Sequence, residues 1–124
     1  MVYLDTHVVA WLYAGTQELL SKDAVRLIEE RDLFISPIVE LELQYLKEAG
    51  KIKKSPRDIM STLSKEINLK ICPKDFHSVV QEAGSFHWTR DPFDRLIVAQ
   101  ASLQEKILIT KDEIIRDHYK KAVW

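Results

Sequence analysis

The chain has 124 residues, 46% of them hydrophobic and 30% charged, which excludes a disordered or fibrous protein and predicts one globular domain over residues 1–124. Its net charge of −1 gives no general attraction to nucleic acid, so polyanion binding would depend on local patches. The single cysteine, Cys72, excludes an internal disulfide, and the longest uncharged stretch (6–17) is too short to span a bilayer. We therefore expect a soluble, cytoplasmic protein that does not bind membranes.

Short apolar runs alternate with helical patterns along the chain. The predicted strands are residues 2–4, 33–35, 69–72 and 107–109, with a weak fifth at 121–123. The predicted helices are residues 7–13, 21–31, 37–49, 55–68, 74–83 and 91–104. This alternation predicts an α/β domain whose mostly parallel sheet of four to five strands is covered by helices on both faces.

Two acids follow predicted strands. Asp5 ends the first apolar run, and Asp112 comes three residues after the fourth. Parallel strands place their carboxyl ends at one edge of the sheet, where ligands bind in open α/β folds, so we expect the two acids to share a site. Local structure offers an alternative for each: Asp5 can cap the following helix, and Thr110 with Glu113 can form a capping box that leaves Asp112 in a first helical turn.

Two more acids lie on apolar helical stripes. Glu42 is central on the face formed by Ile38, Val39, Tyr45, Leu46 and Ala49, and Asp94 shares a stripe with Ile97, Val98 and Ala101. Alternatively, the stem of Glu42 packs while its carboxylate reaches water or an arginine. Asp94 can likewise interact with the helix dipole while Asp91 provides the N-cap.

Four converging carboxylates need a compensating charge, and at least one would retain its proton without it. Oxygen ligands favour Mg²⁺ or Mn²⁺, which makes metal-dependent phosphodiester hydrolysis the leading hypothesis. The four histidines are scattered, which disfavours zinc, and no Gly-rich phosphate loop or nucleophile elbow is present. A phosphatase of the haloacid dehalogenase kind would need a second aspartate where His7 stands.

Basic and aromatic residues flank the predicted site. Arg90 and Arg95 could contact RNA phosphates and Trp88 could stack on a base, although charge runs are commonly just solvated. Arg95 could equally pair with a site acid and lower the pKa of that acid. Trp11 is apolar enough for a dimer contact, with core burial the simpler explanation.

Four segments together resemble the PIN-domain nucleases, and specifically the VapC-type toxins of toxin–antitoxin pairs. They are residues 3–7 (YLDTH), 35–38 leading to Glu42, 90–95 (RDPFDR) and 108–112 (LITKD). The resemblance implies a three-layer α/β/α sandwich in which Asp5, Glu42, Asp94 and Asp112 are the catalytic acids and bind Mg²⁺ or Mn²⁺. It also implies supporting roles for Thr6, Asp91 and Thr110, cleavage of RNA that leaves a 5′-phosphate, a homodimer, and inhibition by a VapB-like antitoxin.

Two other classes of function remain open at this stage. One is a different enzyme on the same metal site, a DNA nuclease or a phosphatase. The other is a non-catalytic RNA- or protein-binding module that keeps the acids for structural reasons. Replacing Asp5 or Asp94 by Asn separates them, because a binding module would keep binding whereas a nuclease would lose cleavage.

Overall fold

The computed structural model describes residues 1–124 and contains one sheet of five parallel strands in the order β3-β2-β1-β4-β5. The strands are β1 (Val2–Leu4), β2 (Leu33–Ile35), β3 (Lys70–Ile71), β4 (Ile107–Ile109) and β5 (Ala122–Val123). The parallel sheet and all five strand positions predicted from the sequence are confirmed. The third strand is shorter than expected, because Leu69 and Cys72 are buried at its two ends without belonging to it.

The strand order reverses at the centre of the sheet. From β1 the chain proceeds to β2 and β3 on one side, and it later adds β4 and β5 on the other. Leu4 is paired with Ile109, and the Asp5 backbone amide donates to the Ile109 carbonyl over 3.1 Å. The carboxyl ends of β1 and β4 therefore lie side by side, at the point where α/β sheets of this kind bind ligands.

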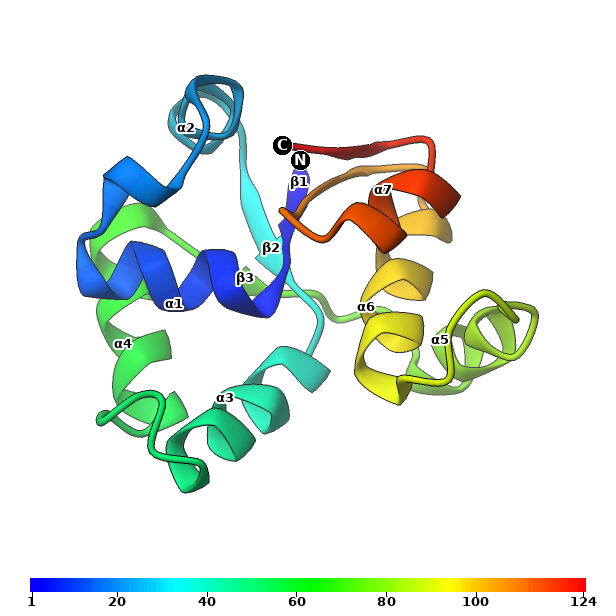
Figure 1. The fold of residues 1–124 in the computed structure, drawn as a ribbon, viewed down its shortest axis with the longest axis horizontal. Helices are drawn as coiled ribbons and strands as arrows, with labels where there is room; N and C mark the ends of the chain where they lie inside the picture. The colour runs from blue at the N-terminus through cyan, green and yellow to red at the C-terminus, as the bar shows by residue number, and fades with distance from the viewer.

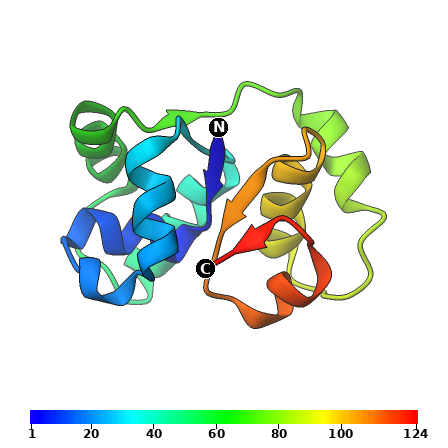
Figure 2. The same cartoon turned by 90° about the horizontal axis from the view of Figure 1, so that it is seen from above.

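Helices cover both faces of the sheet (Figures 1 and 2). In Figure 1, α1, α3 and α4 lie on one side of the strands, and α5 and α6 lie on the other. The helices are α1 (Thr6–Ala14), α2 (Lys22–Glu30), α3 (Ile38–Glu48), α4 (Pro56–Ile67), α5 (Phe76–Ala83), α6 (Pro92–Ser102) and α7 (Glu113–His118), with a 3-10 turn, η1, at Gln17–Leu19. None of them is long and apolar enough to cross a bilayer.

Local capping explains where several helices begin. The side chains of Ser21, Ser55 and Asp91 accept hydrogen bonds from the first-turn amides of α2, α4 and α6, which confirms the predicted N-cap at Asp91. Proline occupies the first position of α4 and α6, where its missing N–H costs no helical hydrogen bond. Helix α5 starts later than expected because Asp75 caps it by accepting from the Ser78 amide.

The buried stripe of α3 differs from the predicted one. Val39 and Leu43 are fully buried, whereas Tyr45 is 55% exposed and packs edge-on against Phe93, with ring centroids 5.2 Å apart. The covered face is therefore rotated from the predicted one, because α3 also packs against α6. On α6 the predicted stripe is confirmed, since Ile97, Val98 and Ala101 are all buried.

Candidate functional site

Asp5 is the most enclosed of the four predicted acids, with only 8% of its surface exposed. It caps α1, and its two carboxylate oxygens have different partners: the Thr6 amide donates to Oδ1 over 2.8 Å, and the Thr110 hydroxyl donates to Oδ2 over 2.6 Å. Burial raises the pKa of Asp5, and these two hydrogen bonds oppose the shift. Asp5 is thus an N-cap, as the alternative explanation proposes. Capping does not explain why its other oxygen is bonded to Thr110, the residue after β4.

Thr110 connects Asp5 to Asp112. While its hydroxyl donates to Asp5, the same oxygen accepts from the Asp112 amide over 3.1 Å. The predicted capping box of Thr110 and Glu113 is wrong: Asp112 itself is the N-cap of α7, where its Oδ1 accepts from the Ile114 and Ile115 amides. Because the Thr110 hydroxyl donates to Asp5, it is Asp112 that caps α7.

Glu42 reaches the site from α3. The buried Thr6 hydroxyl donates to its Oε1, which joins α3 to the start of α1. Burial raises the pKa of Glu42, the Thr6 hydroxyl lowers it, and the negative charges of Asp5 and Asp91 raise it further. Neither water nor an arginine is needed to explain the orientation of this side chain, because Thr6 provides a donor.

Asp94 has the clearest electrostatic perturbation of the four. It lies in the first turn of α6, where the Oδ1 of Asp91 accepts from the Phe93 amide and, over 3.2 Å, from the Asp94 amide. Burial raises the pKa of Asp94 to about 7, followed in size by the charges of four other acids: Asp91, Asp5, Asp112 and Glu42. The other three predicted acids and Asp91 therefore all lie close enough to Asp94 to repel its negative charge.

A cavity of about 540 Å³ opens at this edge of the sheet. Its walls carry five acids and four other side chains: Asp5, Asp91, Asp94, Asp112, Glu113, His7, Val8, Trp11 and Lys111. Glu42 is not among them and approaches only through Thr6. Sequence reasoning gave no role to Trp11 or Lys111 here; the helical spacing of four residues from His7 to Trp11, directly after Asp5, is the signal that could have indicated Trp11.

The donor set fits a hard divalent cation in its chemistry. All the candidate ligands are carboxylate oxygens, and burial has raised the pKa of three of them. No lysine or arginine forms an ion pair with any of them, since the one salt bridge in the protein joins Arg26 to Asp23 on α2. No three of these carboxylates lie close enough together to coordinate one ion as they stand. They would therefore have to move toward the ion when it binds.

The predicted pairing of Arg95 with a site acid is wrong. The Arg95 Nε donates to the Thr89 carbonyl over 2.8 Å, and the pKa of the adjacent Asp94 is raised rather than lowered. Arg90 is exposed on the loop before α6. Trp88 is half-buried and stacks on His118 with 5.1 Å between ring centroids, so one face of its ring is already covered.

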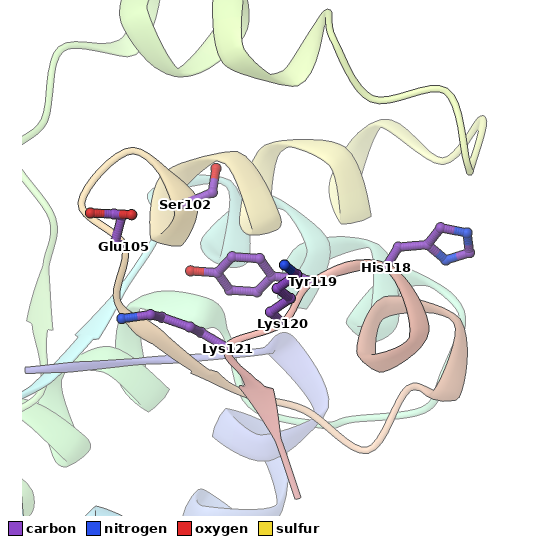
Figure 3. A pocket seen from close by; sticks show the side chains of 6 residues that line it. All are labelled: Ser102, Glu105, His118, Tyr119, Lys120 and Lys121. Atoms are coloured by element: carbon purple, nitrogen blue, oxygen red, sulfur yellow. The ribbon is translucent and has the colours of Figure 1, made fainter.

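A second cavity, of about 370 Å³, lies at the amino ends of β4 and β5 (Figure 3). Glu105 and Lys121 line it just before these strands begin, together with Ser102, His118, Tyr119 and Lys120. It has a single carboxylate. The Tyr119 hydroxyl donates to the Lys106 carbonyl over 2.5 Å, and burial raises the pKa of Tyr119 to about 12.

Comparison with known proteins supports the fold described above. The sequence matches none of the functionally curated proteins. Among solved structures, the fold is similar to a chain of VapBC2 from Rickettsia felis bound to a DNA fragment from their promoter, with 21% identity, a TM-score of 0.68 and coverage of 99% of this chain and 96% of that one. It is similar also to a chain of a toxin–antitoxin complex from Klebsiella pneumoniae, with 18% identity, a TM-score of 0.70 and coverage of 100% and 97%. The sequence model of the PIN domain matches residues 2–121, and the chain therefore belongs to the PIN domain family.

Proposed function

We propose that this protein is a divalent-metal-dependent endoribonuclease and the toxin of a toxin–antitoxin pair. One observation carries the proposal: Asp5, Asp91, Asp94 and Asp112 line one cavity, and burial together with the charges of the neighbouring acids raises the pKa of Asp94 to about 7. A fold maintains such repulsion at the ligand-binding edge of its sheet when a ligand relieves it. A cation of charge two, held by oxygen donors, is the simplest such ligand.

Asp5, Glu42, Asp94 and Asp112 would hold Mg²⁺ or Mn²⁺. When bound, the cation supplies Lewis-acid activation of the phosphodiester and balances the charge of the acids. The Thr110 hydroxyl orients the Asp5 carboxylate and accepts from the Asp112 amide, and the Thr6 hydroxyl donates to the Glu42 carboxylate, which lies outside the cavity lining. Asp91 fixes the first turn of α6 and with it the position of Asp94. Carboxylates that do not contact the ion orient the attacking water.

One structural neighbour is described as a toxin–antitoxin complex and the other as VapBC2 bound to a DNA fragment from their promoter, which supports an antitoxin as the partner of this chain. We infer that a VapB-like protein covers the acidic cavity, that the active protein is a homodimer, and that it acts on cytoplasmic RNA. Trp88 and Arg90, on the loop before α6, and Arg95, within α6, are candidates for contacts with RNA outside the cavity.

The direct test is cleavage of matched single-stranded RNA and DNA by the purified protein with Mg²⁺ or Mn²⁺. We expect cleavage of RNA, products with 5′-phosphate ends, and complete inhibition by excess EDTA. Activity that persists in EDTA would exclude the metal mechanism, and preferential cleavage of DNA would exclude the ribonuclease. Expression of the chain alone should stop growth, and growth should resume with the Asp94→Asn variant or with co-expression of the protein encoded by the adjacent gene.

A further inference from the structure

An apolar hollow lies directly beside the acidic cavity. It has a volume of about 220 Å³, and its walls include Ala10, Leu46 and Ile52. Two residues, His7 and Trp11, line both this hollow and the acidic cavity. Both residues belong to α1, which runs from the acidic edge alongside α3 and α4 (Figure 1). A ligand bound to the acids can therefore extend into the hollow without leaving the protein surface.

Trp11 forms the wall between the two spaces, and its ring is held in place. The ring of Trp124 meets it edge-on at 5.8 Å between centroids, and the exposed His7 ring is tilted against it at 6.0 Å. Trp11 itself is half-buried. An aromatic ring fixed by neighbours and still open to a cavity is a stacking surface that loses little entropy on binding.

Lys111 provides the positive charge that the acidic cavity otherwise lacks. It is the only lysine or arginine in the walls of that cavity, and it forms no ion pair. Its Nζ lies 5.9 Å from the centroid of the Trp11 ring. Lys51, also exposed, lines the apolar hollow. Lys111 thus lines the acidic cavity and Lys51 lines the apolar hollow. A polyanion that spans both would need such positive charges to bind.

We propose that the hollow is a binding subsite for one unpaired nucleobase of the RNA next to the cleaved phosphodiester. In this subsite Trp11 stacks on the base and Lys111 binds an adjacent phosphate. The proposal rests on the proposed ribonuclease function and adds to it a binding subsite, formed by Trp11 and Lys111, for one base of the substrate. A base paired within a duplex has no free face and cannot enter.

The size and lining of the hollow favour a base over other occupants. Ligand pockets for drug-sized molecules are typically about 300–1,000 Å³, so a smaller hollow suits a single ring system. Five of its nine lining residues are aliphatic, and the other four are Trp11, His7, Thr16 and Lys51. Such a lining favours stacking on Trp11 over selection of a base by many hydrogen bonds. We therefore expect a requirement for the presence of a base at one position and only a weak preference among the four bases.

The test uses a series of single-stranded RNA oligonucleotides, each lacking one base at a position near the cleaved bond. For the unaltered protein, loss of the base at one position should raise KM by about 10-fold, the effect of losing one stacked base. The kcat value should stay within about twofold, since stacking is a binding interaction made before and during the reaction. In Trp11→Ala the intact RNA should show the raised KM, and removal of the base should cause no further change.

Four variants complete the design. Trp11→Phe should recover most of the affinity, and Phe76→Ala, which removes an exposed aromatic ring from α5 away from both cavities, should leave KM unchanged. Lys111→Ala should raise KM at every position and lower the salt dependence of binding by about one ion, whereas Lys65→Ala on the exposed side of α4 should not. Thermal unfolding and sedimentation of each variant show whether the fold and the oligomeric state are intact.

The outcomes separate this inference from the ribonuclease proposal. If the unaltered protein cleaves RNA but no base removal affects KM, or Trp11→Ala loses affinity equally with and without the base, the base subsite is wrong and the ribonuclease stands. A change of oligomeric state with a base-independent loss in Trp11→Ala would place Trp11 at a protein interface and would also overturn the inference. If no RNA is cleaved, the ribonuclease proposal fails. Anisotropy of a labelled oligonucleotide on the Asp94→Asn variant then decides whether base-dependent binding exists.

Discussion

The two edges of the sheet differ in what their cavities contain. At the carboxyl ends of the strands, five acids surround about 540 Å³; at the amino ends, His118, Lys120 and Lys121 accompany one glutamate around about 370 Å³. The carboxyl-end edge holds acids whose pKa values are raised by burial and mutual repulsion. At the amino-end edge the Tyr119 hydroxyl is satisfied by a backbone carbonyl. The carboxylates with raised pKa values thus lie at the edge where α/β sheets bind ligands.

The largest expected effect comes from removing one acid at the carboxyl-end edge. Asp94→Asn should lower kcat/KM for RNA by more than about 100-fold, since altering even an outer-shell group of a metal site costs 10–100-fold. The measurement is the cleavage rate of a labelled RNA at saturating Mg²⁺.

The matched change at the other edge is Glu105→Gln, which should alter kcat/KM by no more than about twofold. Equal losses in both variants would mean that the two edges do not differ in function and would contradict the assignment of the site.

A smaller loss is expected for Thr110→Val. The substitution keeps the shape of the side chain but removes the donor to Asp5 and the acceptor for the Asp112 amide. We expect a loss of activity of about 10- to 100-fold, as for other groups that orient metal ligands. Thr110→Ser keeps the hydroxyl and should restore most of the rate; a Ser variant as slow as Val would show that packing, not the hydrogen bond, is what matters.

The pH dependence of stability should be smaller still and opposite in sign to ordinary acid denaturation. The folded state raises the pKa of Asp94 from 3.8 to about 7, so the protein binds a proton more tightly when folded. The stability from this group is fully present below pH 3.8 and is lost as pH rises through 7. A shift of this size corresponds to ~4 kcal/mol before solvent screening, which at a half-buried carboxyl reduces it to about 1–2 kcal/mol.

Urea unfolding in EDTA between pH 5 and pH 8 measures this loss, and the raised pKa values of Asp5 and Glu42 act in the same direction. Asp94→Asn should flatten the profile and stabilise the protein at pH 8. Saturating Mg²⁺ should do the same by neutralising the acids. A profile that rises with pH in EDTA would contradict the repulsion on which the proposed function depends.

Local sequence patterns predict several helix starts and the position of the site at the carboxyl-end edge. Asp91-Pro92 and Ser55-Pro56 predict helix starts because capping and proline geometry act within one turn. The proximity of Asp5 and Asp112 follows from parallel strands.

Helix α7 is not predicted as an element, because a six-residue helix that buries only Ile115 leaves almost no periodic signal. The predicted burial of Tyr45 and the alternative pairing of Arg95 with an acid fail for a different reason: the observed partners, Phe93 and the Thr89 carbonyl, are set by tertiary packing and by a loop path.

The smallest effect is expected at the amino-end edge, from Tyr119→Phe. The change removes the hydrogen bond to the Lys106 carbonyl, which should cost about 1 kcal/mol of unfolding free energy, because water in the open cavity can replace the donor. The activity should not change, since this hydroxyl contacts no acid of the site. Urea unfolding and RNA cleavage measured on the same sample check both parts. A normal unfolding curve with a lost rate would couple Tyr119 to the acids across the sheet, and the separation of the two edges would then be wrong.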